Sequence, residues 1–156
     1  MDFGFSEEQE MLRDAAKRFL ADNCSTKFVR QMMAHETGHD AAFWDKLVGL
    51  GWPGLIIPEE FGGQGGTFLD LTVIAEEAGK ALVPGPFSTA TTLGGPIFVE
   101  GGSPAQKKEF LTKIAGGKLI ATVAVAEASG RWDAGGIELK ATKKGSGYSL
   151  NGEKFF

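Results

Sequence analysis

The chain has 156 residues, 42% of them hydrophobic and 23% charged, which is typical of a folded globular protein. Its formal net charge of −4 argues against a strongly basic surface for nucleic acid or for an anionic membrane. No apolar run approaches the roughly 20 residues that span a bilayer, and the acidic start MDFGFSEEQE lacks the pattern of a signal peptide. The single Cys24 excludes an internal disulfide and suits a reducing compartment, so we expect a cytoplasmic chain without a membrane span or a nucleic-acid partner.

The first helices are predicted from their start and stop signals. Ser6 and Gln9 have the spacing of a capping box, and apolar residues follow at helical intervals as far as Phe19. Further along, Asp40 can cap another helix, and Gly51 stands just past the end of its apolar face. These signals predict that the chain begins with consecutive helices.

Residues 52–66, WPGLIIPEEFGGQGG, combine two prolines with four closely spaced glycines and predict a structured connector between helices. Two other interpretations are an acid/base pair made by Glu59 and Glu60, and a glycine cradle for phosphate. Adjacent carboxylates do not flank a scissile bond, and no Lys-Ser/Thr pair follows the glycines as in a P-loop. We therefore favour a rigid connector whose glycines supply positive φ angles.

The next helix begins at Thr67 and Asp70 and is apolar nearly all round, which indicates a central place in a helical bundle. Glu76 and Glu77 are expected to lie on a solvated flank of this helix. A later helix should begin at Ser103, which is followed by a proline and, at the third position, a glutamine.

Between these two helices, another apolar helix is predicted over about residues 88–99. Phe87, Thr89, Thr91 and Thr92 lie around its start. These residues can line a cavity for an apolar chain, although core packing alone would need the same residue types.

After residue 117 the hydrophobic period changes from 3.6 to 2. Residues 119–126 predict a strand of small and β-branched side chains, and residues 137–142 alternate as in a strand with one solvated face. Asn151 and Gly152 form the sequence of a two-residue hairpin turn.

The predicted fold is therefore α+β. An all-α helical bundle over residues 1–117 is followed, over residues 118–156, by the first antiparallel strands of a β-barrel-like domain. Because the sequence stops at NGEKFF, within an expected strand, we expect it to be part of a longer protein.

The sequence HETGH, His35 to His39, matches the zinc motif HExxH, in which a helix places both imidazoles on one face. Gly38 disfavours a helix through the motif, and Asp40 starts the next helix directly after it. His35 and His39 are therefore expected on different elements, and we assign no metal ligand in this chain.

The stretch AVAEASGRWDAGGI, residues 124–137, leads from a small-residue strand into a carboxylate, a turn and a pair of glycines. Trp132 is its most suggestive residue. A large aromatic in a glycine-rich turn, without apolar neighbours in sequence, more often touches a ligand or a partner than a core.

Taken together, FSEEQEMLRDAAKRFL, LGWPGLIIPEEFGGQGG, GSPAQKKEFLTKIAGGK and LNGEKFF resemble the acyl-CoA dehydrogenase family in their order and spacing along the whole chain. The resemblance implies a helical domain, a middle β domain and a C-terminal helical domain. It also implies FAD as the cofactor, an acyl-CoA substrate that loses a proton and a hydride across its Cα–Cβ bond, and transfer of electrons to an electron-transfer flavoprotein. A homo- or hetero-oligomer is expected.

The resemblance also implies site residues. The family's flavin loop, laid on this chain without a gap, gives Val123, Val125, Ala126 and Glu127 as cofactor-binding positions and Ser129 and Trp132 as substrate-binding positions. Phe156 stands where the family has an aromatic next to the flavin ring, and Phe87, from the possible cavity for an apolar chain, is taken as a further substrate-binding position. The family's catalytic base lies beyond Phe156, so no residue here receives that role.

Three positions in this loop depart from the family's pattern. Ala126 replaces the hydroxyl residue that bonds the flavin edge, Ala128 replaces a proline, and Trp132 replaces the serine that meets the acyl-CoA. A tryptophan at that position changes which acyl groups have room.

Three functions follow from these patterns. The first is the N-terminal part of an FAD-dependent acyl-CoA dehydrogenase, acting on a bulky or non-straight-chain acyl-CoA such as one from lipid or steroid catabolism. The second is a non-catalytic, dehydrogenase-like subunit of a heteromeric enzyme. The third is a zinc hydrolase that uses HETGH. The 156-residue chain alone is expected to be inactive and to bind no FAD tightly.

Overall fold

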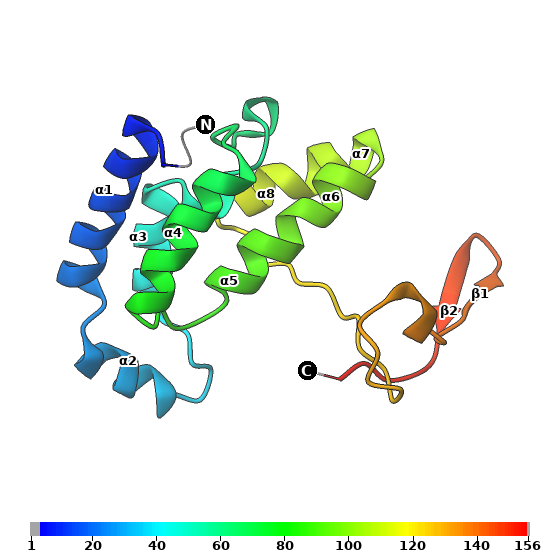
Figure 1. The fold of residues 1–156 in the computed structure, drawn as a ribbon. Helices are drawn as coiled ribbons and strands as arrows, with labels where there is room; N and C mark the ends of the chain where they lie inside the picture. The colour runs from blue at the N-terminus through cyan, green and yellow to red at the C-terminus, as the bar shows by residue number, and fades with distance from the viewer. Residues whose placement is uncertain (1–3, 156) are drawn as a thin grey trace. The chain divides into compact units, whose positions relative to one another are not determined.

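The structure is a computed structural model that describes residues 4–155 (Figure 1). The chain divides into two compact units, Met1–Thr122 and Val123–Phe156. The first unit is helical and the second contains a pair of antiparallel strands, so the predicted α+β class is confirmed. No helix in the described part of the chain is long and apolar enough to cross a membrane.

The helical unit consists of a series of helices with short connectors. In chain order they are α1 (Glu7–Asn23), α2 (Thr26–Met33), α3 (Ala41–Gly49), α4 (Phe68–Lys80), α5 (Phe87–Thr89), α6 (Gly95–Gly101), α7 (Pro104–Gln106) and α8 (Thr112–Ala115). A π-helical turn at Ala90–Gly94 joins α5 to α6, and another at Lys107–Leu111 joins α7 to α8. The apolar helix predicted over about residues 88–99 is therefore present, with an irregular turn inside it.

The predicted start signals place the helices correctly. Reciprocal capping boxes are formed by Ser6 with Gln9, by Thr67 with Asp70 and by Ser103 with Gln106. Asp40 caps α3, because its carboxylate accepts a hydrogen bond from the Phe43 amide at 2.6 Å. Each cap satisfies amides that would otherwise lack a partner at a helix start.

The core of the helical unit is centred on α4, as predicted. Its Leu71, Val73 and Ile74 are at most 1% exposed, and α4 lies between α1 and α5 (Figure 1). Phe68 and Leu69 at the start of α4 are 59% and 50% exposed, so the apolar character all round the helix does not mean that every face is buried.

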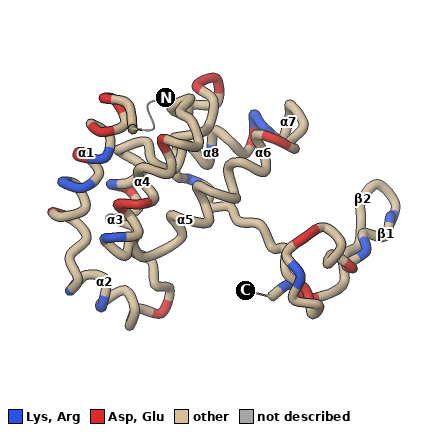
Figure 2. The backbone as a smooth tube through the Cα atoms, viewed as in Figure 1, with Lys and Arg blue, Asp and Glu red and all other residues tan. Residues whose placement is uncertain are grey.

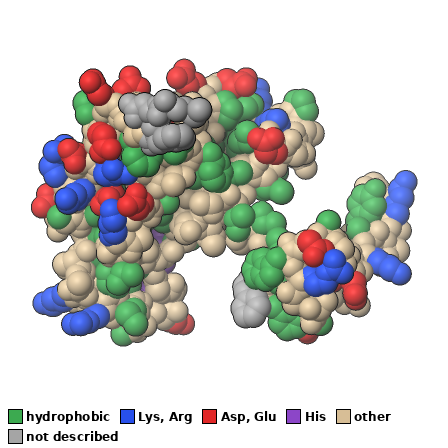
Figure 3. Space-filling model, in the orientation of Figure 1, with side chains coloured by type: hydrophobic (Ala, Val, Ile, Leu, Met, Phe, Trp, Pro, Cys, Tyr) green, Lys and Arg blue, Asp and Glu red, His purple; other side chains and the backbone are tan. Residues whose placement is uncertain are grey.

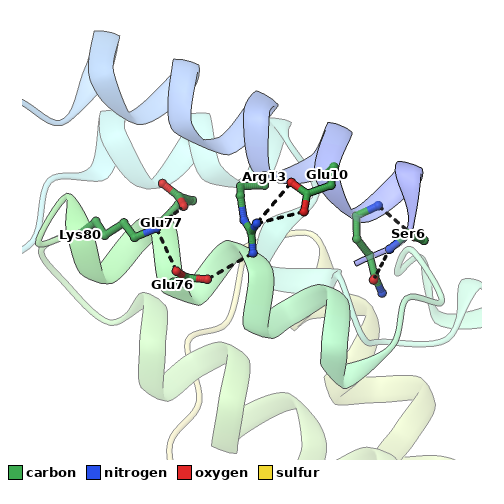
Figure 4. A network of polar contacts seen from close by, with 7 residues as sticks. Ser6, Glu10, Arg13, Glu76, Glu77 and Lys80 are labelled. Carbon is green, nitrogen blue, oxygen red and sulfur yellow. Dashed lines mark hydrogen bonds and ion pairs between the residues drawn. The ribbon is translucent and has the colours of Figure 1, made fainter. Parts of the chain in front are cut away.

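A network of charged side chains links α1 to α4 (Figure 4). Arg13 on α1 pairs with Glu10 at 3.1 Å and with Glu76 at 3.4 Å, and Lys80 pairs with both Glu76 and Glu77. The hydrogen bond from Lys80 holds the pKa of Glu76 below its ordinary value. The prediction of a solvated flank is wrong for Glu77, which is only 6% exposed because α1 packs against this side of α4.

Charges of both signs follow one another along α1 and α4 (Figure 2). In the space-filling view, basic and acidic side chains are interspersed over the same helices (Figure 3). This mixed surface agrees with the composition, which gives no basic excess.

The second unit contains β1 (Ala141–Lys144) and β2 (Gly147–Leu150), which pair antiparallel with Ala141 opposite Leu150 and Lys144 opposite Gly147. The turn between them lies at residues 145–146. The prediction of a hairpin turn at Asn151 and Gly152 is therefore wrong for the described residues.

The two strands predicted before β1 are also not formed as expected. Residues 119–126 have no ladder partner among the described residues, and only the last two residues of the 137–142 segment belong to β1. The alternation of side chains indicates an extended chain, but a strand also needs a neighbouring backbone to bond with.

Candidate functional site

The loop of residues 123–139 lies at the start of the second unit and contains most of the predicted site residues. Ala126 is 2% exposed, whereas Val123, Val125 and Glu127 are half-buried. The Ala126 carbonyl accepts a hydrogen bond from the Phe155 amide at 3.0 Å, so the loop lies beside residues far along the chain.

The Glu127 carboxylate joins the start of this loop to its end by hydrogen bonds. It accepts hydrogen bonds from the amides of Glu138 at 2.7 Å and Leu139 at 3.1 Å, and from Lys154 Nζ at 2.6 Å. These donors, led by the Lys154 ammonium, hold the pKa of Glu127 below its ordinary value. The Glu127 side chain is thus engaged inside the protein, which leaves its backbone as the group that can face a ligand.

The backbone N–H groups of residues 123–128, which we term the amide row, donate no hydrogen bond to any residue that the structure describes. The carbonyls of Val125, Ala126 and Glu127 are all engaged, by Lys154, Phe155 and Gly130 respectively. Buried amides in folded proteins normally have a partner. The amide of Ala126, a buried residue, has no partner among the described residues and is therefore suited to the polar edge of a bound molecule.

The turn that follows presents Trp132 on a braced loop. The guanidinium of Arg131 binds the Asp133 carboxylate through two hydrogen bonds, at 2.7 and 3.2 Å. Asp133 in turn accepts from the Gly135 amide at 2.8 Å and caps the short 3₁₀ helix Ala134–Gly136. Trp132 lies between the paired residues and is 71% exposed, so its indole is open to contact.

Ser129 has a different place from Trp132, although both were predicted to meet the substrate. The Ser129 hydroxyl lies 3.5 Å from the Gly136 carbonyl and 3.4 Å from the Arg131 amide. The Ser129 hydroxyl therefore bonds across the turn to its own backbone. Its predicted contact with substrate stays a prediction.

Phe87 belongs to the helical unit and lines an apolar pocket of about 200 Å³. The pocket is lined by Ala75, Ala78, Gly79, Leu82, Val83, Phe87, Ser88, Thr91 and Thr92. The hydroxyls of Thr91 and Thr92 bond to backbone carbonyls of the preceding turn, at 2.8 and 2.7 Å, which leaves their methyl groups for the lining. Of the predicted cavity residues, Thr89 does not line this pocket.

Phe87 itself is 4% exposed and packs against Trp52, with ring centroids 5.7 Å apart. Its side chain therefore serves the core as well as the pocket. Phe156, the remaining predicted cofactor residue, lies outside the described residues.

HETGH does not form a helical metal site. His35 lies in a turn after α2, where its Nδ1 is 3.0 Å from Thr37 Oγ1, and Gly38 has a φ of 60°. The His39 ring packs edge-on against Trp44. Within residues 4–155 no group of three or more His, Cys, Asp or Glu is placed to hold a metal ion.

The connector over residues 52–66 has the rigid form predicted for it. Gly62 and Gly65 have φ angles of 82° and 63°, and Gly63 lies so close to the backbone of Ile57 that a Cβ would collide with it. Ile57 is fully buried in a core cluster with Leu111 and Ile114. The glycines are thus explained by packing and backbone conformation.

A helical unit followed by a unit with paired strands places the chain in the class of proteins that join an N-terminal helical domain to a β domain. The family described as "Acyl-CoA dehydrogenase, N-terminal domain" matches residues 6–118. This chain belongs to the acyl-CoA dehydrogenase family.

Similar proteins agree with this assignment. The chain is 33% identical to the mitochondrial isovaleryl-CoA dehydrogenase of Pongo abelii over 155 residues, which is 98% of this chain and 37% of that protein. It thus spans well under half the length of such a relative.

Two solved structures have the same fold. The first is an acyl-CoA dehydrogenase complexed with FAD from Bacillus anthracis, which is 29% identical with a TM-score of 0.82 over 96% of this chain and 26% of that one. The second is the ChsE4-ChsE5 complex from Mycobacterium tuberculosis, which is 27% identical with a TM-score of 0.81 over 99% of this chain and 39% of that one.

The sequence alone did not single out Lys154. Lys154 occurs within LNGEKFF, a segment that resembles the family but carries no sign of a contact with residues 125–127. Its partners Val125 and Glu127 lie 29 and 27 residues earlier. No local pattern joins residues at such separations, so the contact becomes visible only in the fold.

Proposed function

We propose that this chain is the N-terminal part of an FAD-dependent enzyme that introduces the α,β double bond into an acyl-CoA thioester. The amide row carries this proposal, because it provides donors without a partner among residues 4–155 at the loop where the family pattern expects the flavin. The FAD complex of the Bacillus anthracis relative supports the choice of cofactor.

The residues present fit a flavin through their backbone. Val123, Val125, Ala126 and Glu127 would hold its polar edge by N–H groups, which do not depend on side-chain identity. Bound FAD would supply the acceptor for the hydride. The missing hydroxyl at Ala126 removes one hydrogen bond, a loss of about 1 kcal/mol of binding.

The substrate is proposed to be a branched or bulky acyl-CoA. Trp132 occupies a position where the family pattern has a serine, and it is 71% exposed on a turn that Arg131 and Asp133 hold rigid. A large ring there excludes some acyl groups and offers an apolar surface to others. The isovaleryl-CoA dehydrogenase relative acts, by its name, on a branched thioester.

An electron-transfer flavoprotein is the proposed electron acceptor, and a homo- or hetero-oligomer the proposed assembly. The ChsE4-ChsE5 complex supports an assembly of unlike subunits for at least one similar protein. Cys24, which is buried and unpaired, suits the cytoplasmic location expected from the sequence.

The test is the absorption spectrum of the full-length protein. We expect flavin bands that bleach under anaerobic conditions when isovaleryl-CoA or a bulkier thioester is added, and that bleach more slowly with straight-chain butyryl-CoA. Trp132→Ser is the matched variant, which should shift the preference toward the straight chain. A colourless protein that stays colourless after incubation with FAD would contradict the proposal.

A second candidate is a dehydrogenase-like subunit without turnover of its own. Ala126 in place of a hydroxyl residue and the exposed Trp132 favour it, since both weaken an ordinary flavin and acyl-CoA site. Co-expression with a candidate partner chain separates the two. Flavin and turnover that appear only in the complex would support the second candidate, whereas turnover by the isolated protein would exclude it.

The 156-residue chain alone is proposed to lack dehydrogenase activity and tight FAD binding. The second unit buries few side chains, so the loop has little support around it. A flavin titration of residues 1–156 that gives micromolar or tighter binding would contradict this.

A further inference from the structure

Three consecutive residues of the candidate cofactor loop are tied down by two residues near the end of the described chain. Lys154 Nζ donates to the Val125 carbonyl at 3.2 Å and to Glu127 Oε1 at 2.6 Å. Between them, the Phe155 amide donates to the Ala126 carbonyl at 3.0 Å. The carbonyls of Val125 and Ala126 and the carboxylate of Glu127 are therefore engaged, while the amide row donates to no residue that the structure describes.

These three hydrogen bonds take the place of the backbone hydrogen bonds that a β ladder would provide. Residues 123–128 have no strand partner among the described residues, and extended backbone without a partner does not hold one conformation. Lys154 supplies two of the bonds from a single ammonium group. Its position thus sets the separation between the Val125 carbonyl and the Glu127 carboxylate.

The ion pair is partly withdrawn from water, which makes its two members depend on each other. The Lys154 side chain is 20% exposed and that of Glu127 is 11% exposed. Removal of one charge from such a pair leaves the other without compensation. Loss of Lys154 should therefore draw the Glu127 carboxylate toward solvent and away from the amides of Glu138 and Leu139.

We propose that Lys154 is a positioning residue for FAD, which acts through Val125 and Glu127 and does not itself touch the cofactor. By holding the Val125 carbonyl and the Glu127 carboxylate, it keeps the N–H groups of the amide row in the arrangement that the flavin edge requires. This inference rests on the proposed function.

The experiment compares variants of the full-length protein, stripped of flavin and titrated with FAD by fluorescence. Lys154→Met should raise the Kd for FAD by about tenfold or more, because a charge-assisted hydrogen bond to a partly buried carboxylate is lost. Lys154→Arg keeps the donors and should stay within about threefold of wild type. Lys143→Met removes a charge from the exposed strand β1 and serves as the matched control, with no change expected.

Two readouts distinguish positioning from a general loss of structure. Rebound FAD in Lys154→Met should show shifted visible absorption bands, because the donors at the flavin edge have moved, and Lys154→Arg should restore them. When Glu127→Gln is already present, Lys154→Met should raise the Kd for FAD little further, because both substitutions disrupt the same ion pair.

A measurement on the flavin-free protein tests the tie separately. The amides of Glu138, Leu139 and Phe155 should lose hydrogen-exchange protection in Lys154→Met and keep it in Lys143→Met. Unchanged protection, or an unchanged Kd for FAD in Lys154→Met, would overturn the inference while the wild-type protein still binds FAD. A wild-type protein that binds no FAD would overturn the proposed function, and this inference with it.

Discussion

The two units of this chain are ordered by different forces. The helical unit hides large apolar side chains, since Leu47, Leu71, Ile74 and Leu111 are all at most 1% exposed. In the second unit, the buried residues among those described are Ala126 and Gly136, and both strands are exposed along their length.

The second unit is held mainly by polar contacts, such as those that link Glu127 to Lys154 and Arg131 to Asp133. Apolar burial does not depend directly on pH or on the screening of charge by salt, whereas ion pairs and charged hydrogen bonds depend on both. The candidate site therefore lies in the unit that is more sensitive to pH and to salt.

The largest expected difference is between two leucines. Leu71→Ala on α4, where the side chain is 1% exposed, should lower the free energy of unfolding by about 2–5 kcal/mol. Leu150→Ala on β2, where it is 65% exposed, should change it by less than about 0.5 kcal/mol. Denaturant unfolding of the full-length variants measures both. Equal costs would mean that the second unit has a core of its own.

Two glycines test packing in the same way, with a smaller effect. In Gly63→Ala the new methyl meets the Ile57 backbone, so we expect a loss of about 1–3 kcal/mol. In Gly147→Ala on β2 nothing lies within 4 Å of the new methyl, and little change is expected. Thermal unfolding of the two variants side by side measures both losses of stability. A larger loss in Gly147→Ala than in Gly63→Ala would contradict the expected difference in packing between the two units.

The starts of α1 and α4 could be predicted from the sequence, because a helix cap is a local feature. Ser6 with Gln9, and Thr67 with Asp70, lie three residues apart, so a reader of the sequence sees both partners at once. The connector over residues 52–66 could be predicted for the same reason, because each glycine indicates a backbone conformation at its own position.

The errors concern residues whose place depends on distant neighbours. Glu77 was expected in solvent and is buried, because α1 covers that side of α4. Residues 119–126 have the composition of a strand but no paired backbone. In the candidate site, the roles of the loop and of Trp132 stay predictions, and the contacts of Lys154 were not predicted, because its partners are 27 and 29 residues away.

After the effects of the leucine and glycine variants, the next largest expected effect is a loss of stability at acid pH that is confined to the second unit. The pKa of Glu127 is lowered in the folded protein, chiefly by the Lys154 ammonium, from an ordinary value of 4.5. Its contribution to stability is therefore complete above that value and is lost as the pH falls through the lower, folded pKa. The protection factor of the Leu139 amide should decline in that range.

Variants define the source of this acid dependence. In Glu127→Gln the decline should disappear, because no carboxylate remains to titrate. In Lys154→Met it should begin at a higher pH, since the main cause of the lowered pKa is gone. A Leu139 protection factor that is flat with pH in the wild type would contradict the assignment.

The smallest effect is expected from the exposed pair of Arg131 and Asp133, whose side chains are 57% and 62% exposed. Arg131→Gln should change the free energy of unfolding by less than about 1 kcal/mol, because water competes for both groups. The mobility of Trp132 should nevertheless rise, which fluorescence anisotropy measures. Unchanged anisotropy would show that the ion pair does not hold the turn.

The ion pair between Glu127 and Lys154 also constrains the order in which parts of the chain can fold during synthesis. Glu127 leaves the ribosome 27 residues before its partner, and β1, β2 and the turn between them are made in the interval. The helical unit, whose core is complete by residue 122, can fold while this happens. The Glu127 carboxylate therefore has no partner in Lys154 until that residue has emerged, and assembly of the loop of residues 123–139 falls among the last folding events of these 156 residues.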